Sequence, residues 1–252
     1  MATLRVTVLD ATTGEPVEAK AHVLSAAGRF LAPRDGILKV GPGLEFFYTD
    51  GRFDLEAPVG QADVVVERGT EYVPVRRVVS VPTEGMVELE VALERWTDLP
   101  AQGWHPGNTH LHYDQNELRP DERLKLDAVI EGYGVTVISV LRRRELPYAS
   151  NRYPIGLFTD LCTAHHIVDV GEESRHNLAT REMDYGGFGY GHVMFINIRN
   201  IVDPVSRGTL VNDLDPDYPP LCWACDDARG QGGTVIWCHN GRGMEAPVAA
   251  AL

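Results

Sequence analysis

The sequence lacks any apolar run that approaches the roughly 20 residues needed to span a bilayer. Its amino terminus also lacks the basic stretch followed by an apolar core that marks a signal peptide; it reads Met1-Ala2-Thr3-Leu4-Arg5-Val6. These two absences exclude an integral membrane protein and indicate a cytoplasmic chain with no membrane partner.

Positive charge is scarce, with 23 lysines and arginines against 36 acidic residues and a net charge of −13. A chain without a basic face is unsuited to binding the phosphate backbone, so nucleic acid is excluded as a generic partner.

Cysteine is also scarce. The four cysteines all lie in the second half of the chain, and without an export signal they are expected to be reduced thiols. Two of them, Cys222 and Cys225, have C-x-x-C spacing, which we interpret as helix packing.

What is present is an ordinary globular composition, 44% hydrophobic and 23% charged over 252 residues, enough for one large domain or two modest ones. Up to about residue 98, apolar residues alternate with polar ones in short segments that turn formers separate. Leu4, Val6 and Val8 begin the pattern, which residues 87–93 repeat. Such spacing predicts an antiparallel β-sandwich over residues 1–98.

After a linker at residues 96–107 the pattern changes. Residues 108–112, 135–140, 167–170, 192–198 and 233–238 read as strands, whereas residues 120–132, 220–229 and 245–252 read as helices. Strands that alternate with helices predict a parallel α/β sheet or barrel over residues 99–252. The expected fold class is therefore a multidomain α/β protein.

Histidine is concentrated in this second part, since only His22 of the nine histidines lies before residue 100. His110 and His112 are two apart on an expected strand, so both imidazoles can face one metal ion. An isolated His-x-His pair is more often without function, so a metal site needs support from further features of the sequence.

Two segments resemble known families. Residues 8–17, 50–53 and 57–60 resemble the transthyretin-like, carboxypeptidase-regulatory-like sandwich. The stretch Gly103-Trp104-His105-Pro106-Gly107-Asn108-Thr109-His110-Leu111-His112 resembles the first motif of the PHP (polymerase and histidinol phosphatase) metallohydrolases, and its lead-in points to their carbaryl-hydrolase-like branch. The resemblance implies a partial PHP-like α/β barrel after the sandwich.

The PHP resemblance also implies further ligands. Glu173 matches the Gly-x-Glu motif of the family, His192 opens the next expected strand, and His239 matches a later histidine motif. The implied cofactor is one or more divalent ions, zinc, manganese or iron, bound by His110, His112, Glu173, His192 and His239. A metal-activated water would then hydrolyse an ester, amide, carbamate or phosphoester bond of a small-molecule substrate.

The resemblance further implies strands and a final Asp beyond Leu252, so we expect a metal domain that is incomplete and prone to associate as a homo-oligomer. The alternative from another class is a non-catalytic binding or structural protein with a degenerate, truncated PHP-like domain. Metal analysis of the purified chain distinguishes the two.

Overall fold

The computed structural model describes residues 1–39, 43–141, 148–177, 189–204 and 221–238. The chain divides into two compact units, residues 1–106 with 121–134 and residues 107–120 with 135–252. Within the described ranges, neither α-helix has the length and apolar character needed to cross a membrane.

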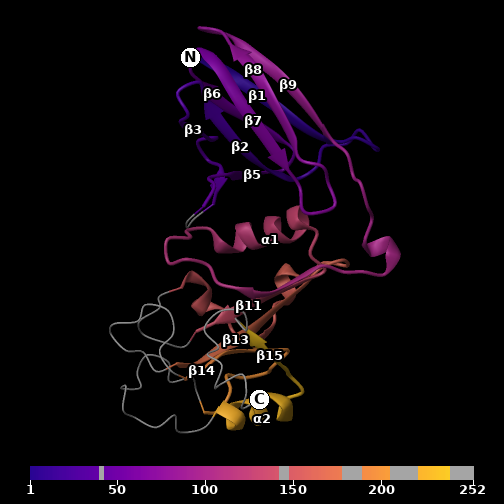
Figure 1. Cartoon of the computed structure of the whole chain (residues 1–252), viewed down its shortest axis with the longest axis vertical. Helices are drawn as coiled ribbons and strands as arrows, with labels where there is room; N and C mark the ends of the chain where they lie inside the picture. Colours follow the sequence, from indigo (N-terminus) through magenta and orange to yellow (C-terminus); the bar gives the residue numbers. More distant parts are fainter. Residues whose placement is uncertain (40–42, 142–147, 178–188, 205–220, 239–252) are drawn as a thin grey trace. The chain divides into compact units, whose positions relative to one another are not determined.

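The first unit contains two sheets that share one core (Figure 1). In the smaller sheet, strand β1 lies between β6 and β9. The larger sheet has the order β4-β5-β2-β7-β8, and β3 also pairs with β2. The strands span β1 (Ala2–Asp10), β2 (Ala19–Ser25), β3 (Phe30–Leu31), β4 (Ile37–Leu38), β5 (Phe47–Thr49), β6 (Arg52–Ala57), β7 (Gly60–Glu67), β8 (Val75–Val81) and β9 (Met86–Leu93).

Alternation along the strands produces this core. Leu4, Val6 and Val8 of β1 are fully buried because alternate residues of a strand point to one face. Val64 and Val66 of β7 contribute the matching face of the larger sheet. The smaller sheet is not purely antiparallel, however: β1 pairs with β6 in antiparallel and with β9 in parallel orientation. The expected antiparallel sandwich is wrong on this point, because strand direction depends on the path between sheets and not on local alternation.

Helix α1 (Pro120–Glu131) packs against the larger sheet within the first unit. Lys20 Nζ lies 2.7 Å from Glu131 Oε1, and the Tyr48 hydroxyl donates a hydrogen bond to Asp127. Burial, with the charge of Asp127 adding to it, raises the pKa of Tyr48 well above its usual value. Gly69 has a φ of +48°, and a Cβ there would lie 2.9 Å from the Glu131 carbonyl oxygen, so the close approach requires glycine.

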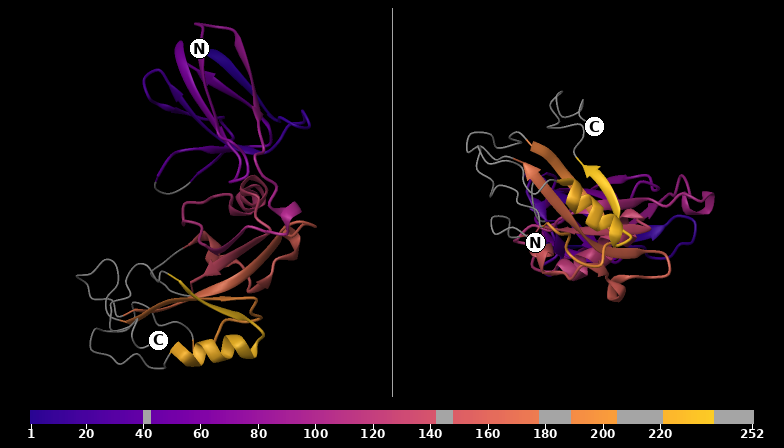
Figure 2. Two further views of the ribbon diagram at one scale, coloured as in Figure 1. Left: turned by 45° about the vertical axis from the view of Figure 1, so that its right-hand side comes forward. Right: turned by 90° about the horizontal axis from the view of Figure 1, so that it is seen from below.

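The second unit is built on one mixed sheet of order β10-β11-β13-β14-β15, with β12 paired to β13. Its strands are β10 (Gly107–Leu111), β11 (Val135–Val140), β12 (Gly156–Leu157), β13 (Ile167–Asn177), β14 (Gly189–Ile196) and β15 (Thr234–Cys238). Helix α2 (Leu221–Gly230) covers the β14–β15 part of one face (Figure 2). Its Ala224 and Ala228 belong to the same buried cluster as Val193 and Phe195 of β14. Three short 3₁₀ helices, at Pro100–Gln102, Ala149–Arg152 and Thr159–Leu161, complete the described elements.

This sheet is not an α/β barrel, and the predicted α/β fold class is wrong. The described residues contain fifteen strands and only two α-helices. β10, β11 and β13 are parallel, but β14 runs antiparallel to β13, and β15 antiparallel to β14. An antiparallel neighbour needs no helical crossover, whereas a parallel one does. The apolar pattern of a strand does not show whether its neighbour runs parallel or antiparallel. The helix expected at residues 245–252 lies outside the described residues.

Candidate metal centre

His110 and His112 lie at the carboxyl end of β10, which borders β11 through the pairs Asn108–Thr136 and Leu111–Ile138. The register shifts between these pairs, so the two histidines occupy an irregular end of the strand. The Asn108 side-chain oxygen accepts the backbone N–H of His110 at 3.1 Å. The histidine side chains are 26% and 14% exposed, which leaves the pair accessible from solvent.

Glu173 comes from β13, 61 residues after His112. It is completely buried and stands opposite Met194 of β14. The preceding carboxylate, Glu172, is equally buried but has another role, because its Oε2 accepts the backbone N–H of Val202 at 3.0 Å. Successive residues of a strand point to opposite faces, so only Glu173 faces the histidines.

Three side-chain atoms converge at this point. Nε2 of His112 lies 3.1 Å from Nε2 of His110 and 2.6 Å from Oε2 of Glu173, and His110 Nε2 lies 3.4 Å from the same oxygen. Tetrahedral zinc holds its ligands at about 2.0–2.2 Å, which separates them from one another by about 3.4 Å. Two of the three spacings are therefore within a few tenths of an ångström of that value, and the third needs to open by about 0.8 Å.

The Nε2 atom of an imidazole carries either a proton or a lone pair. With protons on Nε2, both imidazoles can donate to Glu173 Oε2. With lone pairs on Nε2, the same three atoms can face a cation, and two imidazoles with one carboxylate form a ligand set used for zinc, manganese and iron. The residues present therefore fit a divalent ion.

Two further buried side chains share this face of the sheet. Ser139 of β11 lies with its Oγ 3.8 Å from the sulfur of Met194, and both residues are at most 1% exposed. The ring of Tyr148 stacks on His112, with centroids 4.8 Å apart and planes 19° apart. No local sequence pattern marks these three residues, because strand register brings Met194 opposite Glu173 and tertiary structure brings Tyr148 onto His112.

The structure brings together three of the five expected ligands, His110, His112 and Glu173. His192 lies in β14, where its backbone is in register with Arg175 and Cys238. Nothing about its side chain is described, and His239 lies outside the described residues. Neither is therefore assigned to the centre.

Elsewhere in the described ranges, no other group of three His, Cys, Asp or Glu side chains is close enough to hold one ion. Cys222 is exposed and Cys225 packs at the edge of the α2 core, where burial raises the pKa of its thiol. His166 is buried with its Nε2 3.0 Å from Thr136 Oγ1, and burial lowers its pKa. Cys225 and His166 contribute to packing, whereas exposed Cys222 does not, so the interpretation of the C-x-x-C thiols as helix packing holds for Cys225 alone.

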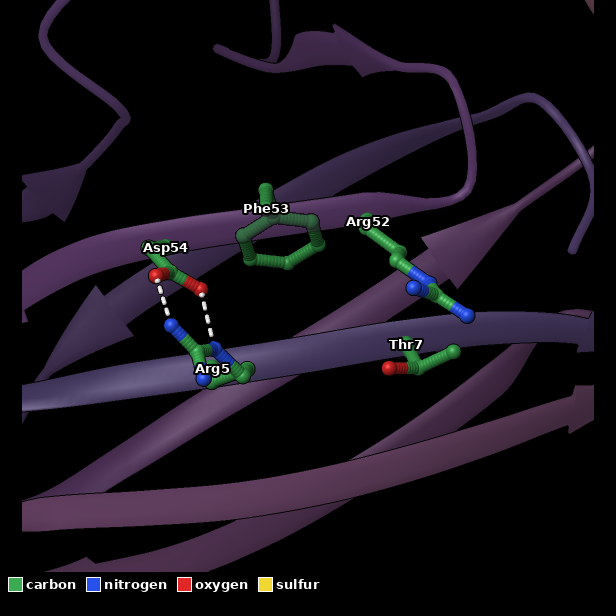
Figure 3. Close-up of a pocket in the computed structure, with 5 residues that line it drawn as sticks. All are labelled: Arg5, Thr7, Arg52, Phe53 and Asp54. Carbon is green, nitrogen blue, oxygen red and sulfur yellow. Dashed lines mark hydrogen bonds and ion pairs between the residues drawn. The ribbon is translucent and has the colours of Figure 1, made fainter.

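A hollow of about 410 Å³ lies on the outer face of β1 and β6 in the first unit (Figure 3). Arg5 and Asp54 form a two-point ion pair across it, with N–O distances of 3.0 and 2.7 Å. Both side chains are nearly half exposed, and their charges cancel. Arg52 also lines the hollow, which contains no group of converging metal ligands.

No protein-family model matches the chain, and no curated protein matches it. One solved structure with partial similarity is the backbone protein of group B streptococcus pilus 2b, with 19% identity over 39% of this chain and 42% of that chain, and a TM-score of 0.30. Another is the C-terminal domain of shaft pilin SpaA from Lactobacillus rhamnosus GG, with 15% identity over 37% of this chain and 96% of that domain, and a TM-score of 0.26. At such TM-scores the similarity supports no conclusion about this chain.

These findings overturn the family identification made from sequence. The described residues form β-rich units with two α-helices and no barrel, and no family model supports a PHP domain. Classification as a carbaryl-hydrolase-like PHP hydrolase with a transthyretin-like module is therefore wrong. The motif resemblance rested on short segments that occur at strand ends in many folds.

Proposed function

We propose that the second unit binds a divalent metal ion through His110, His112 and Glu173. We further propose that the bound ion serves to hydrolyse an ester, amide, carbamate or phosphoester bond of a small molecule. This proposal does not depend on membership of any family, because it rests on the chemistry of the three side chains.

The observation that carries the proposal is the convergence of two imidazole nitrogens and one carboxylate oxygen within 3.4 Å of one another. Placing a carboxylate at full burial is costly unless a positive charge or several donors compensate it. A cation shared with His110 and His112 would compensate the negative charge of Glu173.

Each protein group has a defined task in this scheme. Glu173 would offset the charge of the ion, and the two imidazoles would bind it as neutral donors. When bound, the ion would lower the pKa of a coordinated water towards about 7. The partial exposure of His110 and His112 leaves the centre accessible to a small substrate.

Metal binding is the first test. The purified chain is stripped with chelator, and its affinity for Zn²⁺, Mn²⁺ and Fe²⁺ is measured by calorimetry together with elemental analysis. We expect His112→Ala and Glu173→Gln each to weaken binding by at least tenfold, since a direct ligand matters more than the outer partners whose loss costs about that much. His165→Ala is the matched control, because His165 is an exposed histidine of the same unit. Equal affinity in all four proteins would falsify the site.

Hydrolysis is the second test, with p-nitrophenyl acetate, p-nitrophenyl phosphate and an aryl carbamate as substrates. Turnover that appears with metal, disappears with chelator and is lost in Glu173→Gln supports the proposed reaction. Metal binding without turnover of any substrate contradicts the hydrolytic part and favours a non-catalytic binding protein.

A further inference from the structure

Metal-binding histidines are normally held by a hydrogen bond from the ring nitrogen that does not bind the ion. His112 lacks such a partner among the described residues: its Nδ1 is buried and makes no hydrogen bond there. If Nε2 faces the ion, the proton lies on Nδ1, and the described residues supply no acceptor for it. Another described contact of the ring can then contribute to its orientation.

The stacked ring of Tyr148 occupies the position from which it can do so. Its centroid is 4.8 Å from that of His112, and the two planes are within 19° of parallel. A ring stacked in this way opposes rotation of the imidazole about its Cβ–Cγ bond, because turning would lift one ring edge off its neighbour.

Backbone hydrogen bonds hold Tyr148 against the histidine. The N–H of Ala149 donates to the carbonyl of Tyr113 at 3.0 Å, and the N–H of Tyr113 donates to the hydroxyl of Ser150 at 3.2 Å. Tyr113 directly follows His112, and Ala149 directly follows Tyr148. The first bond therefore joins the residues next to the two rings, and the second joins Tyr113 to the side chain of Ser150, one residue further along; together they hold the two segments close. Both Tyr113 and Ser150 are buried, which protects these bonds from water.

We propose that Tyr148 is a positioning residue that orients His112 for metal binding by stacking on its ring. This inference rests on the metal centre proposed above. It assigns the effect to the aromatic ring and not to the phenolic hydroxyl, so the two parts of the side chain can be separated by mutation.

The test compares zinc affinity in four proteins: wild type, Tyr148→Phe, Tyr148→Leu and the control Phe158→Leu. Phe158 is an aromatic residue of the same unit whose ring contacts Tyr153 and, among the residues that the structure describes, no histidine. We expect Tyr148→Leu to weaken zinc binding by roughly threefold to tenfold, in line with the size of aromatic pair effects. Tyr148→Phe and Phe158→Leu should stay within about twofold of wild type.

Two additional measurements separate positioning from general destabilisation. In a His112→Ala background, Tyr148→Leu should produce no further loss of affinity, because the ring it orients is gone. The visible absorption bands of bound Co²⁺ should change in Tyr148→Leu but not in Tyr148→Phe. Should Tyr148→Leu fail to fold by circular dichroism, Tyr148→Met replaces it as the ring-free variant.

Several outcomes overturn the inference. Equal zinc affinity in wild type and in the folded ring-free variant overturns it while leaving the metal centre intact. Equal weakening by Tyr148→Phe and Tyr148→Leu assigns the effect to the hydroxyl and also overturns it. Failure of the wild-type chain to bind zinc, manganese or iron removes the proposed function and this inference together.

Discussion

Among single residues, Asp10 holds a turn of the first unit together. Its Oδ1 accepts the backbone N–H groups of Thr12 and Thr13 at 2.8 and 3.0 Å, and its Oδ2 accepts the Tyr72 hydroxyl at 3.0 Å. Burial by itself works to raise the pKa of Asp10. The hydrogen bonds to the carboxylate and the charge of Arg68 outweigh burial, so the net effect is a lowered pKa.

Asp10→Ala should lower the free energy of unfolding at pH 7 by about 1–3 kcal/mol, because three donors lose their acceptor. Since the pKa of Asp10 is lower in the folded state than in the unfolded state, its contribution is present above the unfolded pKa. That contribution is lost as the pH falls through the folded pKa. Urea unfolding from pH 7 to pH 3 measures both effects.

The control for Asp10 is Tyr72→Phe, which removes only one of its three hydrogen bonds. We expect this variant to lose about 1 kcal/mol. If the difference in free energy of unfolding between wild type and Asp10→Ala stays constant from pH 7 to pH 3, the lowered pKa assigned to Asp10 is contradicted.

At the scale of elements, the junction of β13 and β14 decides whether Glu173 reaches the histidines. Gly171 lies two residues before Glu173, and a Cβ built at Gly171 would lie 2.2 Å from the Phe195 carbonyl oxygen. Real Cβ atoms do not approach backbone oxygens so closely, so the strands must separate to admit any side chain. Glycine at this position therefore sets the approach of the two strands.

Gly171→Ala should lower the free energy of unfolding by about 2–3 kcal/mol through this clash and should also weaken metal binding, because Glu173 moves with the strand. Gly230→Ala is the matched control at the end of α2, where an added Cβ meets nothing within 4 Å. Chemical denaturation and zinc titration of both variants measure the effect. Wild-type stability in Gly171→Ala would show that the strands adjust without cost.

For the strands of the second unit, the sequence predicted position but not orientation. The continuous apolar run at residues 135–140 is a strand in the structure, β11, because a run of such residues fits burial on both faces. The run at residues 167–170 extends much further, to Asn177, and its second half pairs with β14 in antiparallel orientation. Hydrophobicity marks where a strand lies but contains no information on the direction of its neighbour.

At the scale of the whole molecule, metal should stabilise only the part that binds it. A ligand that binds the native state at 100 times its dissociation constant contributes about 2.7 kcal/mol. We expect zinc to slow amide hydrogen exchange in β10, β11 and β13, which carry or border the ligands. The strands β1 to β9 of the first unit should be unaffected and serve as an internal control.

Hydrogen exchange with mass spectrometry on the full chain measures this pattern with zinc and with chelator. His112→Ala should abolish the protection in β10 and β13. Protection of β1 or β7 by zinc, retained in His112→Ala, would place the binding site elsewhere.

The sequence by itself determined the local features: the buried alternation of Leu4, Val6 and Val8, and the pairing of His110 with His112 two residues apart. These features follow from the two-residue period of a strand, which depends only on residues close together in the sequence. Tertiary structure alone decided the parallel pairing of β1 with β9, the antiparallel pairing of β13 with β14, and the stacking of Tyr148 on His112. Those contacts join segments distant in the chain, and their free energy depends on packing and register, which no local pattern specifies.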